Sequence, residues 1–158
     1  MKKESCLETL EEAILAEKNG ADRIELCADL ANDGLTPDEG LVKKIFENVN
    51  IPIRVMIRPR TGSFCYSKSE LEEMKASILF CKKMKVEGVV FGVLKENNHV
   101  DIENTKILAD LAFPLKVTFH KAIDVTPNIF EEVKRLSQIK TISSVLTSGG
   151  KTTAKEGS

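Results

Sequence analysis

The chain alternates between two spacings of apolar residues, one typical of helices and one typical of strands. Five segments repeat apolar side chains every three or four residues, and six shorter segments read as strands. The expected strands are residues 2–6, 23–27, 52–58, 88–94, 115–120 and 142–147. Five β-α units followed by a sixth strand predict a parallel sheet with helices packed against it.

Short sequence signals mark where four of the expected helices begin. Two segments read as capping boxes, Thr36-Pro37-Asp38-Glu39 and Ser67-Lys68-Ser69-Glu70. Asp101 is expected to cap the next helix, and Thr126-Pro127 is expected to begin the last one. The first helix is expected from four apolar residues and a glycine stop: Leu7, Leu10, Ile14, Leu15 and Gly20.

Two α/β architectures fit this order of elements, an open doubly wound sheet and a (β/α)8 barrel. The length of 158 residues favours the open sheet, because a complete barrel typically takes roughly 250 residues. The strands favour the barrel, because each has one apolar face and one face that turns polar. In the second strand, Arg23, Glu25 and Cys27 alternate with Ile24 and Leu26. A barrel produces this pattern, since its strands meet helices outside and end in a site inside.

Composition and charge narrow the classes of function. Apolar residues make up 42% of the chain, and 23 basic residues against 24 acidic ones give a net charge of −1. This balance argues against a nucleic-acid partner, which usually needs a basic surface. No long apolar run and no secretory signal are present, so we expect a cytoplasmic protein without a membrane partner.

The four cysteines divide into two pairs. There is no C-x-x-C motif, so neither a zinc ribbon nor a thioredoxin-type site is indicated. Cys65 and Cys81 read as small buried hydrophobes. Cys6 and Cys27 are different, because each ends a Glu-x-Cys segment at the carboxyl end of an expected strand.

Neighbouring first and second strands would bring Glu4, Cys6, Glu25 and Cys27 together. A pair of soft thiolates suits Cu(I). The two carboxylates could act as acid or base in catalysis, or could pair with arginines. Chance placement of two cysteines at strand ends is the alternative.

Two arginines end the third expected strand. Arg58 and Arg60 precede a turn through Gly62. The planar guanidinium holds carboxylate or phosphate groups, so this pair reads as an anion clamp. Pairing of the arginines with Glu4 and Glu25 is the alternative, and the two interpretations are compatible.

Further candidates follow the fifth and sixth expected strands. His120 could be a general base, a metal ligand or a structural histidine, with Asp124 placed to orient its ring as a catalytic partner. The turn Thr147-Ser148-Gly149-Gly150 could offer backbone N–H groups to a bound anion. His99 lies in a polar segment and is expected at the surface.

Several of these segments together resemble the CutC copper-homeostasis family. The likeness runs over essentially the whole chain and rests on the combination of motifs. They are Glu4-Ser5-Cys6, Gly20-Ala21-Asp22-Arg23-Ile24-Glu25-Leu26-Cys27, Leu35-Thr36-Pro37, Met56-Ile57-Arg58-Pro59-Arg60, Val117-Thr118-Phe119-His120-Lys121-Ala122-Ile123-Asp124 and Val145-Leu146-Thr147-Ser148-Gly149.

The resemblance implies a TIM (β/α)8-type fold and a cytoplasmic protein involved in copper homeostasis. It implies Cys6 and Cys27 as Cu(I) ligands, and no organic cofactor is predicted. It also implies an enzyme-like site at the barrel mouth, made by a set of polar residues: Glu4, Glu25, Arg58, Arg60, His120, Asp124 and Thr147.

The chain ends soon after the sixth expected strand, whereas a full barrel of this type has eight. We therefore expect an incomplete barrel of about six strands and five helices in residues 1–150. Residues 151–158 are expected to form a polar tail or the start of a sixth helix. A natural isoform, a fragment and a defective gene product are the three explanations. Because an open barrel leaves strand edges unpaired, we expect low stability alone or a homo-oligomer.

Three hypotheses for the function follow. The first is a copper-homeostasis protein that binds Cu(I) at the barrel mouth through Cys6 and Cys27. The second is a barrel enzyme of unknown reaction on a small anionic metabolite, with Arg58 and Arg60 holding the anion and His120 or a glutamate moving a proton. The third is an inactive, truncated form. The sequence leaves open whether the chain is an enzyme.

Overall fold

The computed structural model describes residues 2–157, in which strands and helices alternate. The strands are β1 (Glu4–Leu7), β2 (Arg23–Leu26), β3 (Ile53–Met56), β4 (Gly88–Phe91), β5 (Lys116–Phe119) and β6 (Ser144–Val145). The helices are α1 (Leu10–Lys18), α2 (Glu39–Asn48), α3 (Lys68–Met84), α4 (Ile102–Ala112) and α5 (Ile129–Leu136), with short 3₁₀ helices η1 (Leu30–Asn32) and η2 (Lys121–Val125). Every strand is shorter than its sequence pattern predicts, and the two 3₁₀ helices were not predicted.

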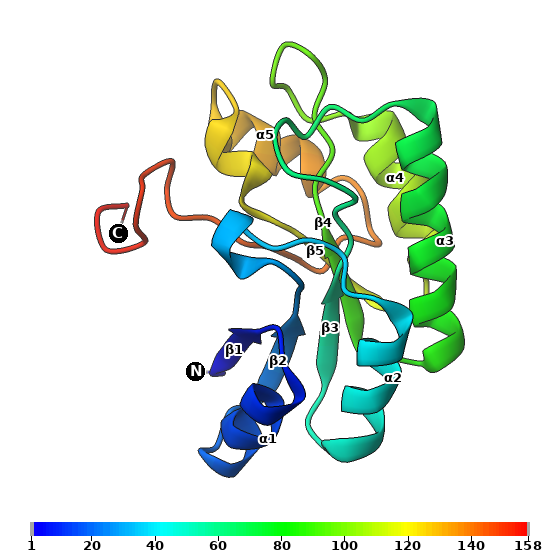
Figure 1. Cartoon of the computed structure of the whole chain (residues 1–158). Helices are drawn as coiled ribbons and strands as arrows, with labels where there is room; N and C mark the ends of the chain where they lie inside the picture. The colour runs from blue at the N-terminus through cyan, green and yellow to red at the C-terminus, as the bar shows by residue number, and fades with distance from the viewer. Residues whose placement is uncertain (1, 158) are drawn as a thin grey trace.

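The six strands form one parallel sheet in the order β1-β2-β3-β4-β5-β6. This sequential order excludes the doubly wound sheet, in which the strand order reverses part-way. Figure 1 shows that the sheet curls and that the helices lie around its outer side. The prediction of an incomplete TIM-type barrel with six strands and five helices is confirmed.

The outer face of the sheet packs against the helices and forms the main hydrophobic core. Alternate strand residues point outward, and Ile24, Val55 and Phe119 among them are at most 1% exposed. Helical side chains such as Met74 and Leu108 cover them. Burial of this outer face therefore supplies most of the apolar contribution to folding.

The inner face of the sheet carries a much smaller apolar cluster. It consists of Cys27, Met56 and Val90, with Leu30 packed against it. The two faces therefore differ as the alternation of residues in the strands indicated. Polar and titratable side chains, Glu25 and Arg54 among them, point into the curve of the sheet.

The predicted helix starts are correct at α3 and α4. Ser67 and Glu70 form the expected capping box at the start of α3. Asp101 caps α4 and accepts a hydrogen bond from the backbone N–H of Asn104. In both cases a short side chain with an oxygen acceptor satisfies an N–H group of the first turn.

The predicted starts of α2 at Thr36-Pro37 and of α5 at Thr126-Pro127 are wrong. The caps lie two residues later, at Asp38 and Asn128. The Thr36 hydroxyl accepts instead from the backbone N–H of Arg58 at 2.8 Å. A tertiary contact with the end of β3 therefore overrides the local signal.

Helix α1 begins later and buries a different face than the sequence pattern predicts. Thr9 caps it within a capping box that was not predicted. Leu7 belongs to β1 and is buried. Ile14 and Leu15 are 46% and 58% exposed, whereas Ala13 faces the core. The apolar spacing therefore identified the helix but not its buried side.

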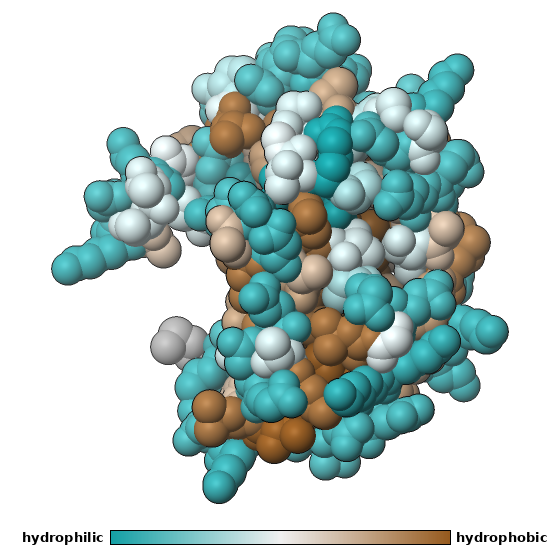
Figure 2. Space-filling model, viewed as in Figure 1, coloured by the Kyte–Doolittle hydropathy of each residue, from teal (hydrophilic) through white to brown (hydrophobic). Residues whose placement is uncertain are grey.

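Figure 2 shows hydrophobic surface gathering in the lower part of the view, over α1 and α2. Ile14 and Leu15 of α1 and Phe46 of α2 are among the exposed apolar side chains. Within residues 2–157, no helix has the length and apolar character needed to cross a membrane.

Candidate functional site

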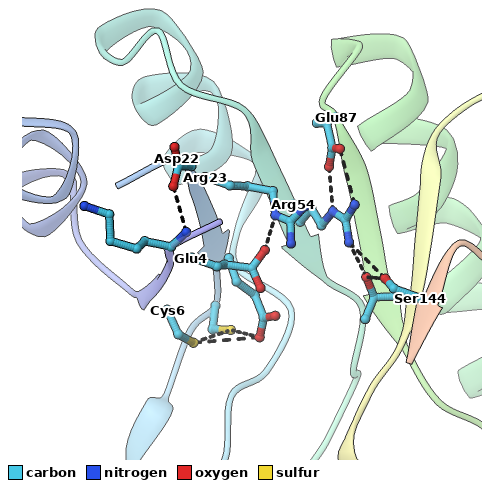
Figure 3. Close-up of polar contacts among 11 residues, drawn as sticks. Glu4, Cys6, Asp22, Arg23, Arg54, Glu87 and Ser144 are labelled. Atoms are coloured by element: carbon cyan, nitrogen blue, oxygen red, sulfur yellow. Dashed lines mark hydrogen bonds and ion pairs between the residues drawn. The ribbon is translucent and has the colours of Figure 1, made fainter. Parts of the chain in front are cut away.

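Three side chains able to bind a metal meet on the inner face of β1 and β2. The Sγ atoms of Cys6 and Cys27 lie 3.7 Å apart. Oε1 of Glu25 lies 3.8 Å from the Cys6 sulphur and 3.9 Å from the Cys27 sulphur. Figure 3 shows dashed lines joining these atoms beside the labelled Cys6. Within residues 2–157, Cys6, Glu25 and Cys27 form the group of potential metal ligands whose donor atoms all lie within 4.8 Å of one another.

The register of the two strands brings these side chains together. Cys6 of β1 lies opposite Glu25 of β2. Cys27 follows β2 directly, and its backbone N–H donates to the carbonyl of Leu7. Because Glu25 and Cys27 are two residues apart in extended chain, both point to the inner face. Local strand geometry therefore builds the group without any special loop.

The three side chains differ in their exposure to solvent. Cys6 is exposed, Cys27 is completely buried and Glu25 is 5% exposed. The group therefore has one ligand on the solvent side and two on the protein side.

The pKa values of both buried members of the group are raised. Burial raises the pKa of the Glu25 carboxyl, and the charge of Glu4 raises it further. The pKa of the Cys27 thiol is raised by its hydrogen bond with Cys6 and by burial. Because thiolate and carboxylate are the binding forms, a metal ion competes with protons for these side chains.

The triangle of donor atoms has the size of a metal-binding site. With sides of 3.7, 3.8 and 3.9 Å, its centre lies about 2.2 Å from each donor, in the range of metal–thiolate and metal–carboxylate bonds. Thiolates favour Cu(I) and Zn²⁺, whereas a carboxylate oxygen is a harder ligand. The residues present therefore fit a soft or borderline metal ion.

Glu4, the other carboxylate predicted to be catalytic, lies apart from this triangle. It is the first residue of β1, so its position at the carboxyl end of a strand was predicted wrongly. Its carboxylate forms an ion pair with Arg23, which Figure 3 shows across the two strands. The charge of Glu4 reaches Glu25 through space rather than through a shared ligand position.

A second polar group on the inner face centres on Arg54 of β3. Its Nε donates to Glu87 at 2.5 Å, and its Nη1 donates to Thr118 at 2.5 Å and to Ser144 at 3.2 Å. Figure 3 shows Glu87 on one side of this guanidinium and Ser144 on the other. The alternation in β3 placed Arg54 on this face, but no sequence signal identified its partners.

Arg58 lies two residues beyond β3 and is 4% exposed. Its Nη1 donates to the carbonyl oxygens of Asn32 and Gly34. The alternative interpretation, in which Arg58 pairs with Glu4 or Glu25, is wrong, because no carboxylate of residues 2–157 forms an ion pair with this guanidinium. Arg58 instead ties the end of β3 to the loop after β2.

Arg60 does not join Arg58 in a clamp. Its guanidinium makes a two-pronged ion pair with Glu70 of α3 and lowers the pKa of that carboxyl. It also donates to loop carbonyl oxygens and lies 5.2 Å from the centre of the Tyr66 ring. The two arginines of the predicted clamp therefore have different partners, because the Arg60 guanidinium is already paired with Glu70.

His120 is buried beside the end of β5. Its Nδ1 accepts from the backbone N–H of Ala122 at 3.1 Å, so Nε2 carries the proton of the neutral ring. Burial and the nearby charge of Arg58 lower the pKa of His120 to about 3. Asp124 was predicted to orient this ring, and that prediction is wrong, because its carboxylate is bound elsewhere.

The Asp124 carboxylate occupies the turn that was predicted to hold an external anion. It accepts from the backbone N–H groups of Ser148 at 2.9 Å and Gly150 at 3.0 Å, and from the Thr147 hydroxyl. Burial raises the pKa of Asp124, but these hydrogen bonds outweigh it and the pKa is lowered. Gly149 and Gly150 have φ values of 68° and 72°, which the turn requires.

The sequence matches the CutC family over residues 1–158. This chain belongs to the CutC family. The family protein CutC of Proteus mirabilis (strain HI4320) is 40% identical over 156 residues, which are 99% of this chain and 62% of the relative. The copper homeostasis protein cutC homolog of Homo sapiens is 43% identical over 156 residues, 98% of this chain and 56% of the relative. The chain therefore spans about three fifths of the length of these curated relatives.

Solved structures agree with this membership. The crystal structure of the putative copper homeostasis protein CutC from Streptococcus agalactiae matches with a TM-score of 0.88 at 32% identity, over 96% of this chain and 74% of the other. A 2,3-dimethylmalate lyase matches with a TM-score of 0.63 at 11% identity, over 93% of this chain and 57% of the other. That second likeness shows a shared fold alone.

The polar contacts of buried Glu132 were not foreseen. The side chain of His99, expected at the surface, is 41% exposed, and its Nδ1 lies 2.7 Å from Oε1 of buried Glu132. The Glu132 carboxylate also binds Arg135 and the backbone N–H of Val100. An acidic residue on an amphipathic helix carries no sequence sign of burial, so this contact had no signal.

Proposed function

We propose that this CutC family chain serves copper homeostasis by binding Cu(I) through the thiolates of Cys6 and Cys27. The observation that carries the proposal is the 3.7 Å separation of two sulphur atoms on neighbouring strands. Soft thiolate ligands select Cu(I) over harder cations. The name of the human relative, a copper homeostasis protein cutC homolog, supports the same role.

Glu25 adds a third, pH-sensitive donor on the buried side. Its Oε1 faces both sulphur atoms, so the ionised carboxylate offers a ligand and the protonated form does not. Binding of Cu(I) releases the thiol protons, and the pKa of Cys27 is raised in the free protein. We therefore expect the affinity for Cu(I) to increase as the pH rises.

Titration with Cu(I) tests the proposal, in competition with a coloured Cu(I) chelator and without oxygen. The wild-type chain is expected to bind one Cu(I). The Cys6→Ser, Cys27→Ser variant is expected to lose that binding, because the hydroxyl is a poor ligand for Cu(I). Circular dichroism of each variant establishes that the fold is intact.

Cys65→Ser is the matched control, because Cys65 is a partly exposed thiol away from the inner cluster. It is expected to bind copper like the wild type. Full binding in the double variant, or equal loss in the control, contradicts the assignment of Cys6 and Cys27.

A further inference from the structure

Arg58 is a buried cation without an anionic partner among residues 2–157. The hydrogen bonds of its terminal nitrogens go to neutral carbonyl oxygens of Asn32, Gly34 and Gly62. Burying a charge is unfavourable unless an opposite charge or strong hydrogen bonds accompany it. The other buried arginine, Arg54, has Glu87 as its partner. Arg58 therefore stands out as a buried positive charge whose only partners within residues 2–157 are neutral groups.

Nε of Arg58, Oη of Tyr66 and Nε2 of His120 are among the four buried side-chain polar atoms of residues 2–157 that lack a well-formed hydrogen bond. The centre of the Phe64 ring lies 5.0 Å from the guanidinium carbon of Arg58 and 5.0 Å from the centre of the His120 ring. Burial raises the pKa of Tyr66 to about 12, and the charge of Arg58 opposes that rise. Phe64 therefore lies against both Arg58 and His120, and Tyr66 follows Phe64 by two residues in the same loop.

The chemistry of these atoms defines their missing partner. Nε of Arg58 always carries a hydrogen, and Nε2 of His120 carries one because Nδ1 accepts from Ala122. The Tyr66 hydroxyl can donate as well. Three donors beside an unpaired positive charge call for a group that only accepts hydrogen bonds and carries negative charge. Carboxylate and phosphate oxygens are such groups.

We propose that Arg58, Tyr66 and His120 bind an oxygen of a small oxyanion, a carboxylate or a phosphate group, beneath the loop between β3 and α3. The anion fills the unpaired positions and neutralises the buried guanidinium. Phe64 of the same loop contacts both Arg58 and His120, so it closes the site on one side.

This site differs from the anion clamp expected from the sequence. Arg60 is occupied by Glu70, and Asp124 fills the turn at Ser148. In the proposed site the second loop donor is therefore the Tyr66 hydroxyl, not Arg60 or the backbone of the Ser148 turn. The site shares no residue with the Cys6–Glu25–Cys27 triangle, so its test is independent of copper binding.

Tyrosine fluorescence reports on this site directly, because Tyr66 is the one tyrosine of the chain and there is no tryptophan. The full chain is titrated at pH 7 with sodium phosphate and, separately, with sodium acetate, at ionic strength held constant with sodium chloride. A saturable change with one anion per chain by calorimetry is expected in at least one arm. The anion whose titration saturates at the lower concentration is the preferred class, phosphate or carboxylate.

Two conservative variants test the assigned groups. Tyr66→Phe removes only the hydroxyl and is expected to weaken anion binding, measured by calorimetry, about tenfold, the usual effect of losing a hydrogen bond to a charged group. Arg58→Lys keeps the charge but loses Nε–H, and is expected to weaken binding at least as much. His99→Gln, which changes the other histidine, is the control and is expected to bind like the wild type.

The pKa of His120, followed by NMR, gives a readout that a purely structural role would not change. A bound anion stabilises the charged ring and is expected to raise this pKa above its value without the anion. Absence of saturable binding of either anion would overturn the proposal. So would wild-type affinity in both folded variants, Tyr66→Phe and Arg58→Lys.

Discussion

The two faces of the sheet bury different kinds of side chain. The outer face and the helices form a continuous apolar core that includes Phe91, Phe119 and Met74, each at most 1% exposed. The inner face buries an apolar cluster of only Cys27, Met56 and Val90 beside charged and polar groups. The outer face therefore holds the fold together, and the inner face carries the candidate metal-binding side chains.

Neighbouring residues of one strand perform these two tasks. Leu26 belongs to the outer core, whereas Glu25 faces the two cysteines. A shift of one residue in the register would exchange the two faces. The apolar requirement of the outer core therefore also fixes the direction in which Glu25 and Cys27 point.

A matched pair of methionine variants tests the difference most strongly. Met74→Ala in the outer core is expected to reduce the free energy of unfolding by about 3 to 4 kcal/mol, because a cavity remains among packed side chains. Met56→Ala on the inner face is expected to cost about 1 to 2 kcal/mol, because the inner cluster is small and adjoins exposed Cys6. Urea unfolding measures both values, and an equal loss would contradict the contrast.

Asp124→Asn tests the polar turn after β6. The loss of charge-assisted hydrogen bonds to Ser148 and Gly150 is expected to cost about 1 to 2 kcal/mol of unfolding free energy. Because the pKa of Asp124 is lowered on folding, its stabilisation is present above the ordinary carboxyl pKa and is lost as the pH falls through the lowered value. Urea unfolding at several pH values should show this loss in the wild type and not in the variant.

Glu25→Gln should change the free energy of unfolding least. Unlike the other variants, it is expected to increase that free energy. The pKa of Glu25 is raised on folding, so its contribution to stability falls as the pH rises from the ordinary carboxyl pKa through the raised value. At pH 7 the variant is expected to be more stable than the wild type by about 1 kcal/mol, because a poorly solvated charge is removed. The gain should vanish below the ordinary pKa of a carboxyl group, and a constant gain at every pH would contradict this account.

Much of the fold was predictable because strand alternation and helix caps are local signals. Ser67 and Asp101 cap helices as predicted, since their partners lie three residues away. Thr36 failed as a cap because its hydroxyl is bound by the backbone of Arg58, which is distant in sequence. Tertiary contacts of this kind leave no local pattern.

In the candidate site too, local strand patterns were predictable and tertiary contacts were not. Cys6, Glu25 and Cys27 could be placed together because strand parity and the pairing of adjacent strands decide their positions. The partners of Arg60 and Asp124 were not foreseen, because loops and turns bring Glu70 and Ser148 to them. Tyr66 was not among the predicted residues, because its burial beside an arginine leaves no motif in the sequence.

We propose that the inner face presents Cys6 and Cys27 as ligands of one Cu(I) ion. X-ray absorption at the copper edge of the Cu(I)-loaded chain tests it most directly, because it identifies the ligand atoms. We expect two sulphur ligands per copper ion in the wild type and in Cys65→Ser, and none in the Cys6→Ser, Cys27→Ser variant. Copper bound only by nitrogen or oxygen in the wild type, or an unchanged spectrum in the double variant, would contradict the claim.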